Sequence, residues 1–206
     1  MGVISNGTTM LDAGALDNGV PTGSMTLIKT LTASSVATIS FVNGSASVVL
    51  DGTYKEYLFK FTDVHPATQG SILKVNFSDD TSSHAYNLTK TTTQFYSRHD
   101  EDGTDGSLVY NTSADIAQAT GDQEIVLNTN NNNDSSACGE LTLFNPADTT
   151  FVKHFISTSN SDGESSRCFT TYVSGYVNTT AAVTAVQFTY GGANIDAGTF
   201  KLYGIK

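Results

Sequence analysis

Short runs of alternating apolar and polar residues recur along the chain, separated by turns rich in Gly, Asn, Asp and Ser. Alternation with a period of two places successive side chains on opposite faces of an extended strand, and such closely spaced strands are typical of an antiparallel sandwich or barrel. The predicted strands are residues 25–31, 36–42, 46–50, 54–64, 72–77, 86–91, 94–96, 124–127, 138–144, 151–156, 168–173, 185–190 and 199–205. The pattern therefore predicts an all-β fold, with residues 25–206 as one domain.

The composition excludes two broad alternatives. Charged residues make up 15% of the chain, so its polar surface must consist largely of Thr, Ser, Asn and Gly, which are poor helix formers. Only residues 113–119, with Ser113 as N-cap, are a candidate for a short helix. A net charge of −10 argues against nucleic-acid binding, and no apolar run is long enough to predict membrane insertion.

The first 24 residues differ from the remainder. Two apolar segments flank Asn6-Gly7, the dipeptide that most favours a two-residue hairpin turn. A small, turn-rich segment without aromatic residues follows. We expect residues 1–24 to form an extended N-terminal arm or hairpin used for assembly, with a frayed tail as the alternative. The candidate assembly residues are Val3, Ile4, Met10 and Leu11.

Sequence motifs for catalysis are lacking. There is no G-x-S-x-G and no H-E-x-x-H, so we expect a non-enzymatic protein without catalytic residues, metal or cofactor. The acidic residues 100–105 resemble calcium-binding chemistry without the spacing of a calcium loop, and a solvated loop is the favoured interpretation. His154 alternates with Val152 and Ile156, which predicts a packed side chain.

Two further features concern recognition and redox chemistry. Asn130, Asn131, Asn132 and Asn133 form a polar loop, a candidate for surface recognition of neutral polar targets such as glycans, or one that only solvates. Cys138 and Cys168 each stand at the start of an apolar strand. They are a candidate disulfide across neighbouring strands, although two buried free thiols are the favoured interpretation.

Several segments together resemble a family of small structural proteins from tailed bacteriophages, especially marine and freshwater ones. These segments are TLIKT (26–30), YKEYLFKF (54–61), VHP (64–66), TKTTT (89–93), GELTLFNP (139–146), TFVKHF (150–155) and KLYGIK (201–206). The resemblance covers most of residues 25–206. It implies a single β-sandwich of the jelly-roll type, preceded by an arm.

The resemblance also implies a function in the virion, after assembly in the host cytoplasm. We expect a tail-fibre or appendage component that aids host attachment, with a capsid decoration (cement) protein as the alternative. The expected partners are further copies in a homotrimer, neighbouring virion proteins and a host surface glycan. A carbohydrate-binding module is the second class of function, and a glycan-degrading enzyme the third.

Overall fold

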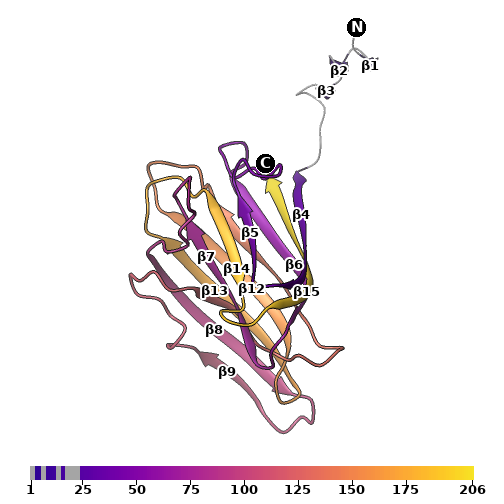
Figure 1. Ribbon diagram of the computed structural model, residues 1–206, viewed down its shortest axis with the longest axis vertical. Coiled ribbons are helices and arrows are strands. Elements are labelled where there is room, and N and C mark those ends of the chain that lie inside the picture. Colours follow the sequence, from indigo (N-terminus) through magenta and orange to yellow (C-terminus); the bar gives the residue numbers. More distant parts are fainter. Residues whose placement is uncertain (1–2, 6–7, 13–14, 17–23) are drawn as a thin grey trace.

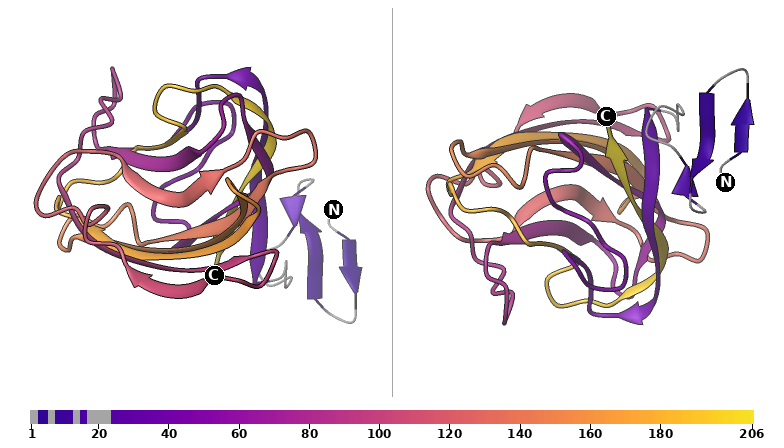
Figure 2. Two further views of the ribbon diagram at one scale, coloured as in Figure 1. Left: turned by 90° about the horizontal axis from the view of Figure 1, so that it is seen from below. Right: turned by 90° about the horizontal axis from the view of Figure 1, so that it is seen from above.

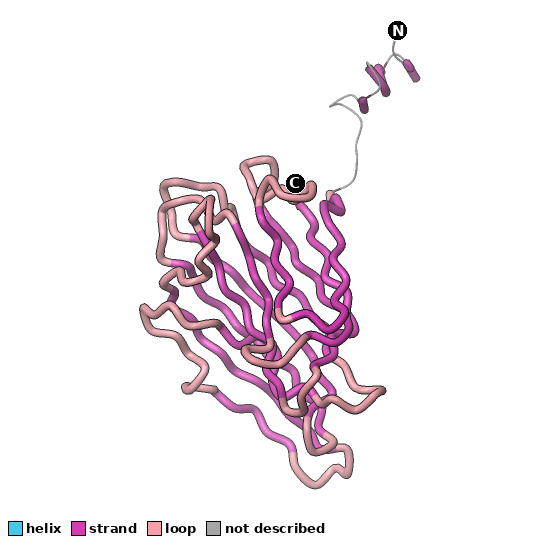
Figure 3. The backbone as a smooth tube through the Cα atoms, viewed as in Figure 1, coloured by secondary structure: helices cyan, strands magenta, loops and turns pink. Residues whose placement is uncertain are grey.

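A computed structural model describes residues 3–5, 8–12, 15–16 and 24–206, with side chains from residue 24 onward. The described residues form strands, turns and loops without any helix (Figures 1 and 3). The predicted all-β fold is confirmed.

Eight strands build a jelly roll of two packed layers. One layer has the order β4 (Met25–Val36), β15 (Ile195–Ile205), β6 (Glu56–Pro66) and β11 (Ala137–Phe144). The other has the order β5 (Thr38–Val42), β14 (Ala185–Thr189), β7 (Ser71–Ser78) and β10 (Gln123–Thr129). All pairings are antiparallel, and this interleaved strand order is that of a jelly roll. Figure 2 shows the two layers end-on.

Four additional strands widen the first layer to eight. They are β12 (Lys153–Gly163), β13 (Arg167–Val177), β8 (Lys90–Asp100) and β9 (Gly106–Tyr110), and they follow β11 in that spatial order. The pair β8 and β9 is inserted between the jelly-roll strands β7 and β10, and the pair β12 and β13 between β11 and β14. The wide sheet therefore presents a continuous outer face, turned away from the four-stranded layer.

Aromatic side chains fill the space between the layers. The Phe188 ring on β14 lies 5.8 Å from the ring centroid of Phe59 and 5.3 Å from that of Phe200, on two strands of the opposite layer. All three are buried. On β14 and β15 the positions on either side of these rings are only partly buried, so burial of the rings fixes the register of the sandwich.

The predicted N-terminal hairpin pairing is present. β1 (Val3–Ser5) pairs antiparallel with β2 (Thr8–Asp12), which pairs with β3 (Ala15–Leu16). Among the described strands, no ladder joins this small sheet to the jelly roll. The turn residues Asn6 and Gly7 lie outside the described residues, as do the side chains of Val3, Ile4, Met10 and Leu11.

Three local predictions are wrong. Residues 46–50 form no strand, because Ala46 and Ser47 lie in a turn with φ angles of 49° and 69° and residues 48–50 are irregular. Of the predicted strand 86–91, residues 86–89 are a loop, since β8 begins at Lys90. The segment 113–119 is not helical, because its backbone bonds to β8 instead: Ile116 N donates to Thr92 Oγ1 and Thr92 N donates to Ile116 O, both over 2.9 Å.

Candidate functional site

Exposed hydrophobic side chains gather on the outer face of the wide sheet. Within residues 24–206, eight large hydrophobic residues are exposed, and seven of them point outward from this face; Phe151 lies in the loop before β12. The seven are Met25, Leu27, Phe95, Leu108, Tyr110, Ile156 and Tyr172. Concentration of apolar surface on one face of a protein indicates an interaction site.

An aromatic row lies across the last three strands of this surface, at its β9 edge. Strand register places Phe95 of β8 directly opposite Tyr172 of β13 on one side and Tyr110 of β9 on the other. The Phe95 and Tyr172 rings are stacked, with centroids 4.9 Å apart and planes 13° from parallel. They are 43% and 40% exposed, and Tyr110 is 59% exposed. Stacking holds the two rings upright on the sheet, with apolar surface left in contact with water.

A cavity of about 160 Å³ lies beside the stacked pair. The outward side chains that line it are Phe95, Tyr172, Ile156, Thr93 and Ser174. Two aromatic rings and an isoleucine thus supply apolar walls, and two hydroxyl groups supply hydrogen-bonding positions. None of the residues that line the cavity is charged.

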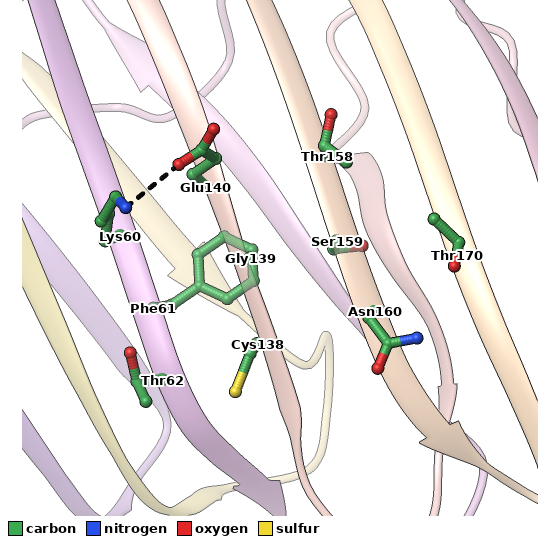
Figure 4. A pocket seen from close by; sticks show the side chains of 10 residues that line it. All are labelled: Lys60, Phe61, Thr62, Cys138, Gly139, Glu140, Thr158, Ser159, Asn160 and Thr170. Atoms are coloured by element: carbon green, nitrogen blue, oxygen red, sulfur yellow. Dashed lines mark ion pairs between the residues drawn. The ribbon is translucent and has the colours of Figure 1, made fainter.

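A polar groove of about 400 Å³ continues across the same face over β6, β11, β12 and β13 (Figure 4). Thr158 pairs with Tyr172, which connects the groove to the aromatic row. An ion pair lies at one side of the groove, between the neighbouring strands β6 and β11, with 3.4 Å between Lys60 Nζ and Glu140 Oε2 (Figure 4). Both side chains are about half exposed, so solvent screens the pair and its contribution to stability is small.

The loop that follows β9 fixes the position of Tyr110 through Asp115. The Tyr110 hydroxyl donates to Asp115 Oδ2 and lies 3.3 Å from Thr93 Oγ1, which donates to it. The other oxygen of Asp115 accepts a 2.8 Å hydrogen bond from Gln94 N. These bonds orient the ring at the end of β9 toward the cavity that Thr93 lines.

The asparagine loop has a more structural position than its composition indicates. Asn130 is only 7% exposed, and its backbone N donates to Asp162 O over 3.0 Å. Asn131 is half-buried, whereas Asn132 and Asn133 are exposed. Asn132 O lies 3.1 Å from His65 Nε2. Surface recognition by this loop stays a prediction. Of the four asparagines, only Asn132 and Asn133 have exposed side chains that are accessible to a ligand.

The two cysteines are free and exposed, so the expectation of buried thiols is wrong. Cys138 is on β11 and Cys168 on β13, with β12 between them. Two strand spacings correspond to about 10 Å. Disulfides require Cα atoms within about 7 Å, and the described geometry therefore leaves the candidate pair unbonded. Asn160 Nδ2 lies 3.2 Å from Cys168 Sγ.

Arginine side chains hold the acidic segment 100–105. Arg167 Nε lies 2.7 Å from Asp100 Oδ1, and Arg98 Nη2 lies 2.6 Å from Asp105 Oδ2. In the part of the chain that the structure describes, no group of three or more His, Cys, Asp or Glu side chains is arranged to hold a metal ion.

His154 is exposed, in contrast to the prediction. Its neighbours in sequence, Lys153 and Phe155, point into the interior, so the outward set on β12 is the one that includes His154 and Ile156. The His154 ring lies 6.0 Å from that of Tyr176 on the outer face. On β12 both sets of alternate residues contain polar and apolar side chains, so the alternation does not indicate which set faces the core.

The aromatic row was not predicted as a site. Phe95 falls within a predicted strand. The pattern does not predict β9, which carries Tyr110 and Leu108, because its five residues begin at a glycine after an acidic turn. A usable signal is an aromatic residue in a series of alternate positions that is otherwise polar. Thr91, Thr93 and Phe95 form such a series.

Fold and site together define a jelly-roll protein whose wide outer face carries exposed aromatic and hydroxyl side chains. Comparisons of the chain with protein-family models, with curated proteins and with solved structures found no match. Within the described residues, nothing has the length and apolar character of a membrane-crossing helix.

Proposed function

We propose that the protein is a non-enzymatic structural component exposed on a tailed bacteriophage particle, where it belongs to a tail appendage that aids host attachment. The observation that carries the proposal is the small N-terminal sheet. Its strands have three, five and two residues and share no ladder with the jelly roll among the described strands.

A sheet of this size gains too little from its own pairing to be stable in water without a packing partner. Exchange of this segment with a neighbouring subunit would supply the partner and hold copies together as a homotrimer. The jelly roll itself is an architecture of capsid and lectin domains, which agrees with exposure on a particle. The resemblance of several segments within residues 25–206 to phage structural proteins is a further support for this placement.

The alternative placement is a decoration protein that cements the capsid, and copy number separates the two. Quantitative mass spectrometry of purified particles, with antibody labelling in electron micrographs, measures both abundance and position. We expect a few dozen copies or fewer, located on the tail. Hundreds of copies on the head would assign a decoration role, and absence from purified particles would overturn the proposal.

A further inference from the structure

The stacked rings of Phe95 and Tyr172 do not contribute to the hydrophobic core. Both rings lie on the outer face and leave the core intact without them, because the buried rings belong to the inner face. Exposed aromatic surface is unfavourable in water, so a pair held upright beside a cavity is best explained by a ligand that covers it.

The surroundings of the pair restrict the chemistry of that ligand. Thr93 and Ser174 place hydroxyl groups in the cavity, and Ile156 completes its apolar wall. The cavity has no charged lining residue, although the chain carries a net charge of −10. An anionic ligand would be repelled by the protein as a whole, and a cationic one would find no carboxylate in the cavity.

We propose that this cavity binds one sugar ring of a neutral polysaccharide. The C–H face of the sugar packs against the rings and Ile156. Its hydroxyl groups exchange hydrogen bonds with Ser174 and donate to Thr93 Oγ1, whose own proton is donated to Tyr110. The polar groove beside Thr158 takes the next part of the chain. The site is pre-organised, since eleven residue pairs join β8 to β13 and little ordering is needed on binding.

A second copy of the protein is a poorer occupant of the same surface. A stable interface buries about 800 Å² on each partner, and the copy would bring its own net negative charge. Contact with an apolar face would also bury the Ser174 hydroxyl without water to bond to, whereas Thr93 Oγ1 keeps its bond to Tyr110. A ligand that itself carries hydroxyl groups satisfies Ser174.

The test is affinity electrophoresis of the purified full chain in gels that contain hydroxyethylcellulose, laminarin, dextran or galactomannan, with acidic alginate for comparison. The chain contains no Trp, so quenching of tyrosine fluorescence then gives Kd for the polysaccharide that retards it most. The variants are Tyr172→Ala, Phe95→Ala and Thr93→Val. Phe151→Ala is the matched control, because it removes an exposed ring outside the cavity.

We expect retardation by at least one neutral polysaccharide and an increase in Kd of about tenfold in Tyr172→Ala and Phe95→Ala. Thr93→Val should weaken binding while circular dichroism stays unchanged, and Phe151→Ala should bind like the parent. Lack of retardation in every neutral gel overturns the proposal, as does equal loss in Phe151→Ala. Self-association that Tyr172→Ala abolishes, without glycan binding, would assign the face to a second copy. The assay does not depend on placement in a particle.

Discussion

Two lysine side chains, Lys90 and Lys153, are fully buried at the beginning of β8 and β12. Both stand opposite Val177 in the strand register, one on each side of it. Their ammonium groups donate to backbone carbonyls: Lys90 Nζ to Leu88 O and Gly121 O, and Lys153 Nζ to Phe151 O. Carbonyl oxygens satisfy the hydrogen bonds of a buried ammonium without neutralising its charge, so each lysine connects a loop to the sheet at an electrostatic cost.

Lys90 gives the protein a specific pH dependence. Burial lowers the pKa of Lys90 from 10.5 to about 8, against the opposing effect of Asp122. Between about pH 8 and pH 10 the unfolded chain therefore binds more protons than the folded one, and stability rises with pH. We expect the free energy of unfolding of the parent, relative to that of Lys90→Met, to increase by about 1.4 kcal/mol per pH unit in this window.

Urea titrations of both proteins at pH 7, 8, 9 and 10 measure this difference. Burial raises the pKa of Tyr57 to about 12 and that of Tyr190 as well, so these tyrosines also affect stability at high pH. Their contribution is common to both proteins and cancels. A difference that stays flat from pH 8 to pH 10 would show that Lys90 does not titrate in this way.

Gly139 on β11 is required by close packing. A Cβ atom at this position would lie 2.6 Å from Phe61 Cζ and 2.7 Å from Ser159 Cβ. Gly139→Ala should therefore lower the free energy of unfolding by about 1–3 kcal/mol, measured by urea denaturation. Gly121→Ala is the control, because its Cβ would enter open space. Equal stability of the two variants would mean that the Phe61 ring moves aside freely.

Among the elements, the four strands added to the jelly roll are β12, β13, β8 and β9, and a loop stabilises β8. β9 pairs with β8 only from Phe95 to His99, and residues 111–119 bond to the remaining edge of β8, where Lys90 pairs with Ala119 and Asn111 N donates to Gln94 O. The buried side chains of Thr92 and Gln94 form hydrogen bonds to residues 111–124. Hydrogen bonds between polar side chains and a loop thus stabilise β8, whereas packed aromatic rings stabilise the jelly roll.

Asp115 is the residue of this loop with the clearest measurable effect. β9 ends at Tyr110, so Gln94 N bonds to the Asp115 carboxylate rather than to a strand. Asp115→Ala removes this acceptor and that of Tyr110, and should cost about 1–3 kcal/mol. Deuterium uptake should rise in peptides that cover residues 90–94 and 111–118. Asp134→Ala, which removes an exposed loop carboxylate, should leave uptake there unchanged.

The limits of prediction from sequence lie in the same elements. The antiparallel sandwich and most strands are predictable, since their inward positions are apolar. Residues 46–50 have the same alternating pattern as the strands, because Val48 and Leu50 are buried, although these residues form no strand. The loop 113–119 is shaped by bonds to β8, which lies about 20 residues earlier and leaves no local signal. The aromatic row depends on the register of three strands, information that arises only on folding.

At the scale of the whole molecule, the two ends of the jelly roll meet. Lys206 N donates to Ser24 O over 3.1 Å, and Met25 pairs with Ile205. These contacts tie the beginning of β4 to the end of β15 at one end of the jelly roll (Figure 1). The ladder that completes the sandwich begins after residue 23, so the jelly roll has no need of the preceding strands for its own hydrogen bonding.

Deletion of residues 1–23 should therefore leave a folded jelly roll with a thermal midpoint within about 2 °C of the parent, because a loss below 1 kcal/mol shifts a domain of this size by no more than a few degrees. Sedimentation velocity should show the full chain as a trimer and the shortened chain as a monomer, since the proposed exchange of the segment is what joins subunits. Full-length Ile4→Asp, which places a charge at an apolar position of the segment, should behave like the deletion at unchanged chain length. A shortened chain that unfolds or aggregates would make the segment part of the core, and one that still forms trimers would move the subunit contact to the jelly roll itself.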